Sequence, residues 1–519
     1  MARKSPNLQS RSLVHSYWGQ FPYDTTTPPD TYEGRTGDVG GAQLPNVAAA
    51  LSLSEFAKLE AGDIAATISE ADPIAGSEFG FWFCIFPGVA GVGGAVWIRL
   101  DATGSGNTTQ TIRDAHRIVV GIAGLTTGTP ATDTLLNLSP YTAGVSADFI
   151  DTGDGAGLAL AIATATAMGN PVDVRIVSGG IDLEAGLITT PLVVPSGCRI
   201  IGAGSSQTEI EGRDTADQGI FFMSANTALE GLSLVSKAPT ATPGTSIGIV
   251  QSTGVQGGDF KLRDISITIQ DESTPARVAR VGVYAVAAGS GAPKSCDMDR
   301  VSVAVDGSIA TAGFNIEGYV GSNIENCSTT GAHTGLRFSG GLGPSIPGNA
   351  AGHISNFRGW DILEGGILVE NIFGQASIFG LSISDSFVKF STDGDETDPQ
   401  YVIRITTDTN CIMDQISVSG LQAHWPANAQ AANRRFGWMA AGSGGRIKGL
   451  RFVNCGATSG LAYSSSLTLG LHFDSVDNES IRGTDLGCDF AGLGLTPAEV
   501  INVLGGTVAW EHAHSSGLA

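Results

Sequence analysis

The chain has 519 residues, of which 42% are hydrophobic and only 15% charged, and glycine occurs 72 times. Long β-rich chains with many turns have this composition, and the length is sufficient for a large core. The 50 acidic and 28 basic residues give a net charge of −22, which argues against nucleic acid or an anionic membrane as the main partner. We therefore expect partners that are neutral, or that are bound at a local basic patch.

The N-terminus is basic, but no apolar run of the length of a signal peptide follows it, and no apolar stretch is long enough to span a membrane. We expect synthesis and folding in the cytoplasm, without a signal peptide or membrane insertion. Seven cysteines lie far apart without a CxxC motif, which predicts reduced, buried thiols and neither a metal site nor a cofactor. They are Cys84, Cys198, Cys296, Cys327, Cys411, Cys455 and Cys488.

Residues 1–50 are polar and rich in threonine, proline and glycine, so they cannot bury enough surface to fold alone. Four aromatic residues nevertheless lie close together in this segment: Tyr17, Trp18, Phe21 and Tyr23. The segment is therefore either disordered or, as the aromatic residues favour, an extended arm that becomes ordered against another protein.

Residues 51–146 are interpreted as a separate small domain. A short helix is predicted from Leu51, with Ser54 as its N-cap. Alternating aromatic residues in EFGFWFCIF and the later strand-like AVWIRL predict a hairpin or small β-domain between residues 74 and 100.

At residue 147 the pattern changes to an alanine-rich helix, GLALAIATATAMG, followed by short strand-like runs. Leu158, Ile162 and Ala165 lie on one face of this helix, and Gly169 is its predicted end. Because a stack of repeated coils needs a cover at its open end, the helix is interpreted as a cap.

One short pattern then returns eight times between residues 228 and 456, at intervals of 24 to 36 residues. Its copies are aligned on Leu232, Ile265, Val301, Cys327, Phe357, Leu381, Ile416 and Leu450. A second series places a glycine before alternating apolar residues, at Gly219, Gly248, Gly282, Gly313, Gly335, Gly366 and Gly470. Two short strands in every repeat, stacked coil on coil, predict a parallel β-solenoid, whereas the recurrent glycines disfavour helical repeats.

The order DGAG, alanine-rich helix, SGGI, PLVVPSGCRIIGAG and TEIEG resembles the entry into the pectate-lyase-like right-handed parallel β-helix of bacteriophage tailspikes. The resemblance covers residues 147–212, and the repeats extend it to residue 490. It implies an all-β homotrimer whose N-terminal part attaches to other virion proteins, here residues 1–146 with the four aromatic residues of the arm. Residues 491–519 are then a short C-terminal cap.

The resemblance also implies a surface that binds or cleaves a host polysaccharide. Cleavage needs two carboxylates about 5 to 10 Å apart, and the candidate acids are Asp361, Glu364, Asp393, Asp395 and Glu396. A less favoured pair is Asp299 with Glu325, which occupy like positions in consecutive copies. A solvated acidic turn and a calcium site remain alternatives for the cluster between residues 393 and 398.

Four candidate glycan-binding residues, His424, Trp425, Arg434 and Arg435, lie in a long predicted excursion, residues 421–438. A fifth, Trp360, lies on the coil that supplies Asp361 and Glu364. An exposed tryptophan can stack on a sugar ring while arginine binds hydroxyls or carboxylates. Packing of Trp425 against the solenoid or a trimer interface is the alternative.

Three hypotheses for the function follow. The first is a receptor-binding virion spike that contacts host polysaccharide, the second a polysaccharide depolymerase on the same spike, and the third a structural virion fibre without glycan contact.

Overall fold

The computed structural model describes residues 41–44, 64–67, 80–86, 96–99 and 117–122, and residues 149–513 except for short gaps. Those gaps are 169–171, 189, 213–218, 237–246, 253–258, 271–279, 288–294, 307–311, 341–348, 372–376, 393–398, 427–433, 460–467, 476, 478–479, 491–500 and 506. The chain divides into two compact units, residues 1–150 and 151–519. The predicted arm, with Tyr17, Trp18, Phe21 and Tyr23, and the helix predicted from Leu51 lie outside the described residues.

Unit 1–150 contains a four-stranded sheet in the order β1 (Gly41–Leu44), β2 (Ile64–Thr67), β3 (Gly80–Phe86) and β4 (Val96–Arg99). Strands β3 and β4 pair antiparallel, with Phe83 opposite Ile98, so the predicted hairpin is present. Further along the chain lie β5 (Arg117–Ile122) and β6 (Phe149–Asp151).

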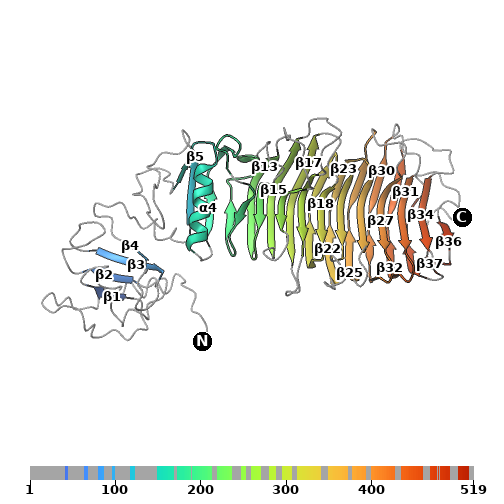
Figure 1. Cartoon of the computed structure of the whole chain (residues 1–519). Helices are drawn as coiled ribbons and strands as arrows, with labels where there is room; N and C mark the ends of the chain where they lie inside the picture. Colours follow the sequence, from blue (N-terminus) through green and yellow to red (C-terminus); the bar gives the residue numbers. More distant parts are fainter. Residues whose placement is uncertain are drawn as a thin grey trace. The chain divides into compact units, whose positions relative to one another are not determined.

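Helix α4 (Ala156–Met168) begins the second unit, where it was predicted (Figure 1). Leu158, Ile162 and Ala165 are buried, as the apolar face required. The buried carboxylate of Asp151 accepts hydrogen bonds from the backbone N–H groups of Gly155, at 2.9 Å, and Leu158, at 2.9 Å. Since the first N–H groups of a helix have no partner within it, this carboxylate fixes where the helix starts.

The rest of the second unit is a parallel β-helix made of two stacked sheets, as the repeats predicted (Figure 1). The small sheet holds β9 (Leu192–Val194), β12 (Phe221–Met223), β14 (Ile247–Ser252), β16 (Arg280–Val286), β18 (Ala312–Glu317), β21 (Thr334–Ser339), β24 (Gly365–Asn371), β27 (Gln400–Thr407), β31 (Arg434–Ala441), β34 (Thr468–Ser475) and β36 (Ile501–Gly505).

The large sheet holds the strands that alternate with these along the chain. In this unit they are β7 (Asp173–Ile176), β8 (Gly179–Asp182), β10 (Arg199–Ile201), β11 (Thr208–Glu211), β13 (Thr227–Ser236), β15 (Phe260–Gln270), β17 (Cys296–Asp306), β19 (Val320–Glu325), β20 (Ser328–Thr330), β22 (Asn349–Ser355), β23 (Arg358–Ile362), β25 (Ser377–Ser384), β26 (Phe387–Phe390), β28 (Ile412–Asp414), β29 (Ser417–Ser419), β30 (Gln422–Trp425), β32 (Arg446–Val453), β33 (Gly456–Ser459), β35 (Ile481–Leu486) and β37 (Ala509–Ala513). Strands β36 and β37 each add a rung in parallel, so the coil continues beyond residue 490.

One column of residues with left-handed backbone bends the coils of the large sheet from β13 to β35 at the same place, and we call it the corner column. Their φ angles lie between 49° and 65°, and the residues are Gly231, Asp264, Arg300, Asn326, Asn356, Asp385, Gly420, Asn454 and Gly487. Glycine, asparagine and aspartate tolerate this conformation best, which explains most of the list. Asn356 Nδ2 donates to Asn326 Oδ1 at 2.8 Å, and Asn326 Nδ2 donates to Asp299 Oδ1 at 3.0 Å. The corner column divides the large sheet into an upstream half, before the corner, and a downstream half, after it.

The register corrects part of the predicted repeat alignment. Leu232, Ile265, Val301, Cys327 and Phe357 follow the corner column and stack, as predicted. The next residue in that stack is Ser386, whereas Leu381, Ile416 and Leu450 form a different column in the upstream half. The alignment slipped because a buried serine replaces the apolar residue; its hydroxyl donates to Ser384 O and accepts from Phe357 N.

The glycines of the second series lie in the small sheet, where two coils approach too closely for a side chain. A β-carbon on Gly335 would lie 2.6 Å from the carbonyl oxygen of Gly366, and one on Gly313 would lie 2.1 Å from Thr329 Oγ1. These distances are far below contact, so glycine recurs for steric reasons.

Stacked aliphatic and aromatic side chains fill the interior between the sheets, with Phe221, Phe314 and Phe338 fully buried. The six cysteines whose side chains are described are free and buried, in agreement with the prediction; Cys84 lies outside the described side chains. Among the helical residues that the structure describes, no segment is both long and apolar enough to cross a membrane.

Candidate functional site: a charged groove and the surfaces beside it

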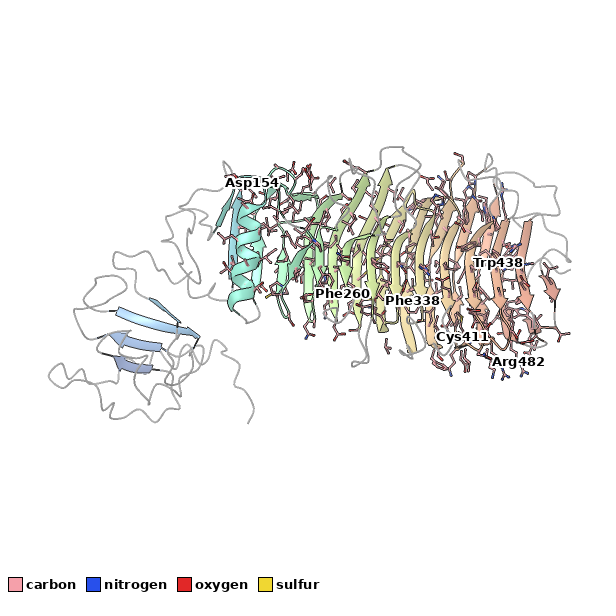
Figure 2. The ribbon with its side chains drawn as sticks, viewed as in Figure 1. Asp154, Phe260, Phe338, Cys411, Trp438 and Arg482 are labelled. Carbon is pink, nitrogen blue, oxygen red and sulfur yellow. The ribbon has the colours of Figure 1, made fainter. Side chains whose placement is uncertain are left out.

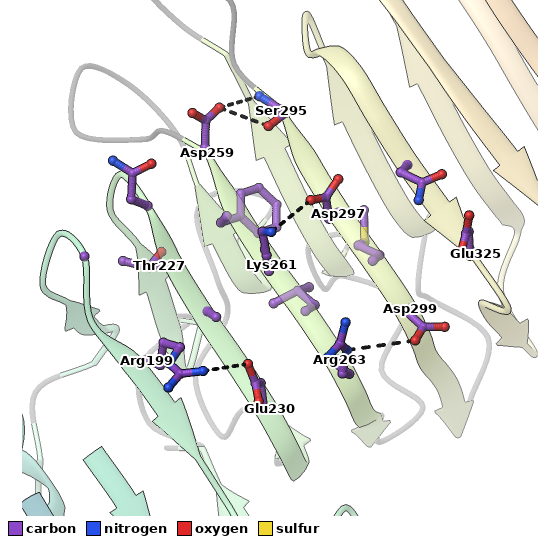
Figure 3. A pocket seen from close by; sticks show the side chains of 17 residues that line it. Arg199, Thr227, Glu230, Asp259, Lys261, Arg263, Ser295, Asp297, Asp299 and Glu325 are labelled. Atoms are coloured by element: carbon purple, nitrogen blue, oxygen red, sulfur yellow. Dashed lines mark hydrogen bonds and ion pairs between the residues drawn. The ribbon is translucent and has the colours of Figure 1, made fainter. Parts of the chain in front are cut away.

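A groove of about 620 Å³ lies on the outer side of the upstream half, across β10, β13, β15, β17 and β19; we call it the charged groove (Figure 3). Along these strands alternate residues point inward, as Leu229, Leu262 and Met298 do, so the residues between them line the groove. Its charged lining residues are Arg199, Glu230, Asp259, Lys261, Arg263, Asp297, Asp299 and Glu325.

Opposite charges face each other across neighbouring strands of the groove. Lys261 lies opposite Asp297, with Nζ and Oδ2 3.5 Å apart, and Arg263 lies opposite Asp299, with Nε and Oδ2 4.0 Å apart. Arg199 Nη1 lies 3.8 Å from Glu230 Oε1. The cations stay accessible within these pairs, since the side chains of Lys261 and Arg263 are 71% and 60% exposed. The groove is thus a regular array of exposed donors and acceptors on a rigid sheet.

Beside the charged groove, two ion pairs favour the charged forms of Arg199 and Asp264. Arg199 Nη2 lies 2.6 Å from Asp173 Oδ2, and the hydrogen bond to this carboxylate raises the pKa of Arg199. Arg300 Nη2 donates to Asp264 Oδ2 at 3.0 Å, and the hydrogen bonding of this guanidinium lowers the pKa of Asp264.

Asp299 and Glu325 are paired residues on β17 and β19, so the predicted stacking of these acids is confirmed. Paired residues of neighbouring strands lie about 4.8 Å apart. Asp299 is surrounded by donors: Arg300 Nη1 lies 2.6 Å from its Oδ2, and Asn326 Nδ2 donates to its Oδ1. No hydrogen bond or ion pair of the Glu325 side chain is found within the described part of the chain. The two carboxylates therefore differ in environment at one end of the charged groove.

The other candidate acids are not brought together as a described pair. Asp393, Asp395 and Glu396 lie outside the described residues. Asp361 follows Trp360 on β23 in a left-handed conformation, and its Oδ1 lies 3.7 Å from Lys389 Nζ. Glu364 lies in the turn before β24, where its backbone N–H donates to His333 O at 3.0 Å.

Trp360 and His424 lie on the outer side of the downstream half, two rungs apart and separated by Lys389. Trp360 is 41% exposed and packs against Phe387 with ring centroids 5.2 Å apart. The His424 imidazole Nδ1 lies 3.1 Å from Thr458 Oγ1. Trp360, Phe387, Lys389 and His424 are called the Trp360 surface below.

The structure corrects the expectations for Trp425 and Arg434. The segment from residue 421 to 438 is not one excursion, because β30 and β31 occupy both of its ends. Trp425 is fully buried; its ring stacks on Phe390 at 4.9 Å, and Nε1 donates to Gln400 Oε1 at 3.1 Å. Arg434 is 3% exposed. Neither side chain can meet a sugar at the surface, because β30 and β31 direct both inward.

The last of the five glycan-binding candidates is Arg435, which lies beside Trp438 on the outer side of the small sheet. Sequence reasoning missed the charged groove and also Arg404, which is paired with Trp438 one coil away. The signal in the sequence that could have revealed the charged groove is opposite charge at equivalent positions of consecutive early copies, as in Arg263 and Asp299. No group of three or more metal-ligating side chains gathers among the residues described.

The fold and these surfaces define a parallel β-helix protein with charged and aromatic outer faces. No protein-family model matches the sequence, and no curated protein matches it. Among solved structures, the A-module of an Azotobacter vinelandii mannuronan C-5 epimerase, AlgE6, is similar at 12% identity, over 70% of this chain and 97% of that chain, with a TM-score of 0.39. ORF18 of Geobacillus virus E2 is similar at 10% identity over 86% and 74%, with a TM-score of 0.33. Tailspike protein 3 of bacteriophage CBA120 is similar at 10% identity over 84% and 64%, with a TM-score of 0.32.

Proposed function

We propose that this chain is a homotrimeric virion spike whose parallel β-helix binds a host surface polysaccharide in the charged groove. Residues 1–146 attach it to other virion proteins. The tailspike-like entry sequence supports the virion role, and the groove itself carries the binding proposal.

The charges of the groove favour a polymer that is rich in hydroxyl groups and carries no charge of its own. Each ion pair offers donors on Lys261 or Arg263 and acceptors on Asp297 or Asp299, and hydrogen bonds to charged groups contribute about 1.5–3 kcal/mol each. The acids of the groove outnumber its bases, so an anionic polymer would be repelled. A sugar chain lying across the strands passes first the Arg199–Glu230 pair, which spans β10 and β13, and then the pairs that span β15 and β17.

The Trp360 surface offers a second contact on the same sheet. The indole of Trp360 is accessible for stacking on a sugar ring, while Lys389 and His424 provide hydrogen-bonding groups beside it. Binding there is independent of the charged groove, because the corner column lies between the two halves.

Cleavage of the polysaccharide is the second candidate function, and the pairing of Asp299 with Glu325 favours it. Retaining glycosidases hold their two carboxyl groups about 5 to 5.5 Å apart, close to the spacing of neighbouring strands. Asp299, which is contacted by Arg300 and Asn326, is the nucleophile in this scheme, and Glu325 is the general acid. Asp361 and Glu364 remain a weaker alternative, since Asp361 is paired with Lys389.

The test incubates the full chain with purified capsule or lipopolysaccharide of the host and measures both retention and chain length. Binding predicts retention that is weakened by Lys261→Gln and unchanged by Arg451→Gln, an exposed arginine outside the groove. Cleavage predicts shortened oligosaccharides that disappear in Glu325→Gln. Trp360→Ala should weaken retention if the polysaccharide also binds at the Trp360 surface, and should leave it unchanged if only the charged groove binds. If the polysaccharide is neither retained nor shortened, glycan binding is refuted and the structural fibre is the hypothesis that remains.

A further inference from the structure

Two arginines and a tryptophan form a compact cluster on the outer side of the small sheet. Arg404 on β27, Trp438 on β31 and His472 on β34 are paired residues on successive rungs. Trp438 is labelled in Figure 2. Their neighbours Ile405, Met439 and Phe473 are buried in the core, so the three residues lie on the opposite side of the strands, where His472 is itself buried at 2% exposure. Arg435 reaches the same tryptophan from β31.

Both guanidinium groups pack on the same indole. Arg404 Cζ and Arg435 Cζ each lie 4.0 Å from the centroid of the Trp438 ring. The ring of His472 lies 6.3 Å from that of Trp438, at an interplanar angle of 60°. Cation–π contacts of this kind fix the guanidinium planes, but they leave the N–H groups at their edges for other partners.

Within the described residues, neither of these cations forms an ion pair with a carboxylate. Arg199, Arg300 and Arg337 each have an acidic partner within 4.0 Å, whereas no such ion pair of Arg404 or Arg435 occurs among the residues described here. Arg404 Nε donates to Thr406 Oγ1 at 3.1 Å, which leaves its terminal amino groups available.

Three buried donors of the cluster find no acceptor within the described part of the chain. Arg435 Nε, Arg435 Nη1 and Trp438 Nε1 are shielded from solvent and make no hydrogen bond to any described residue. A buried donor without an acceptor costs about 1–3 kcal/mol, and more when it is charged. Burial and the nearby charge of Arg404 both lower the pKa of Arg435, although Asp474 opposes them. The arrangement is therefore complementary to an anion.

We propose that Arg404, Arg435 and Trp438 form a binding site for the carboxylate group of an acidic saccharide. The two guanidiniums donate to the carboxylate oxygens in the planar geometry that arginine offers and lysine does not. That the carboxylate belongs to a saccharide rests on the proposed function, whereas the need for an anion rests on the cluster alone. The site differs in sign from the charged groove, so one spike would bind neutral and acidic sugars at different faces.

The test is calorimetric titration of the full chain with tetragalacturonate, with the neutral galactose tetramer and with inorganic phosphate. We expect tetragalacturonate to bind, and Arg435→Gln and Arg404→Gln each to weaken it about tenfold or more, since a charge-assisted hydrogen bond is lost. Arg404→Lys keeps the charge and should restore only part of the affinity. Arg451→Gln is the matched control and should bind as the wild type does. The thermal midpoint of each variant is measured to show that it is folded. Because Arg404 and Arg435 are replaced separately, one variant still tests the inference if the other fails to fold.

Three results would overturn the inference. Wild-type affinity in both Arg404→Gln and Arg435→Gln would place the anion elsewhere. Displacement of tetragalacturonate by an equal concentration of phosphate would mean a site for small anions rather than for sugars. A change of oligomeric state in Arg435→Gln, measured by light scattering, would make this face a contact between copies of the chain.

The outcome is separable from that of the proposed function. Lys261→Gln in the charged groove should leave tetragalacturonate binding unchanged. If tetragalacturonate binds at the cluster while no host polysaccharide is retained, the proposed function fails and the inference stands. If Lys261→Gln weakens the binding of tetragalacturonate while Arg404→Gln and Arg435→Gln do not, the inference fails and binding in the charged groove stands.

Discussion

Replacing Trp425 by alanine should destabilise the β-helix far more than replacing Trp360. Trp425 is fully buried, stacks on Phe390 and donates to Gln400 Oε1, whereas Trp360 is 41% exposed. Truncation of a buried tryptophan costs about 3–5 kcal/mol. The buried oxygen of Gln400 then loses its donor, which adds about 1–3 kcal/mol. Trp360→Ala removes part of one contact with Phe387 and should cost well below half of that sum.

Trp425→Phe separates the two contributions, because it keeps an aromatic ring against Phe390 and removes only the indole N–H. The assay is the thermal midpoint of the full chain by circular dichroism, at one heating rate and one concentration for all variants. We expect the order of midpoints to be wild type, Trp360→Ala, Trp425→Phe and Trp425→Ala, with several degrees between the extremes. Equal midpoints for the two alanine variants would refute the assignment of Trp425 to the core, and with it the correction to the glycan-binding residues.

Two further predictions concern the corner column. Asn356→Ala should lower the thermal midpoint more than Asn356→Gly, because alanine at a φ of 51° costs about 1–2 kcal/mol, while both variants lose the hydrogen bond to Asn326; equal midpoints would contradict this. Asp264→Asn keeps the left-handed preference but loses the ion pair with Arg300, so its midpoint should lie below that of the wild type at pH 7. Arg300 lowers the pKa of Asp264 below 3.8, and the stability it gives is present above that pH and lost as the pH falls through the lowered folded-state pKa. The gap should therefore close in acid, and a gap that widens there would disprove the linkage.

The repeats determined the fold class because each coil follows the same rule of alternating buried and exposed residues. The capping helix was equally predictable, since Leu158, Ile162 and Ala165 form one apolar face ahead of the first coil. The alignment failed at Ser386, where a buried serine makes its own hydrogen bonds and does not look like a core residue in the sequence.

The surfaces were harder to predict, because they depend on register across coils of unequal length. Asp299 and Glu325 were recognised because both precede a clear copy of the pattern. Arg404 and Trp438 were not, because the glycine series that marks the small sheet has no copy on their strands, β27 and β31, between Gly366 and Gly470. The direction of Trp425 depends on β30, whose four residues are too few for a reliable period.

The corner column also has a consequence for how this β-helix can diversify. Each bend takes one residue in every coil, but the segment between the downstream half and the small sheet varies freely in length: it separates Gln270 from Arg280 in one coil and only Ile362 from Gly365 in another. Loop closure becomes more costly only slowly with length, by about 0.6 kcal/mol per doubling. Recombination or laboratory grafting can therefore exchange these segments between parallel β-helices, altering the surface that is presented while the bends keep the coils in register.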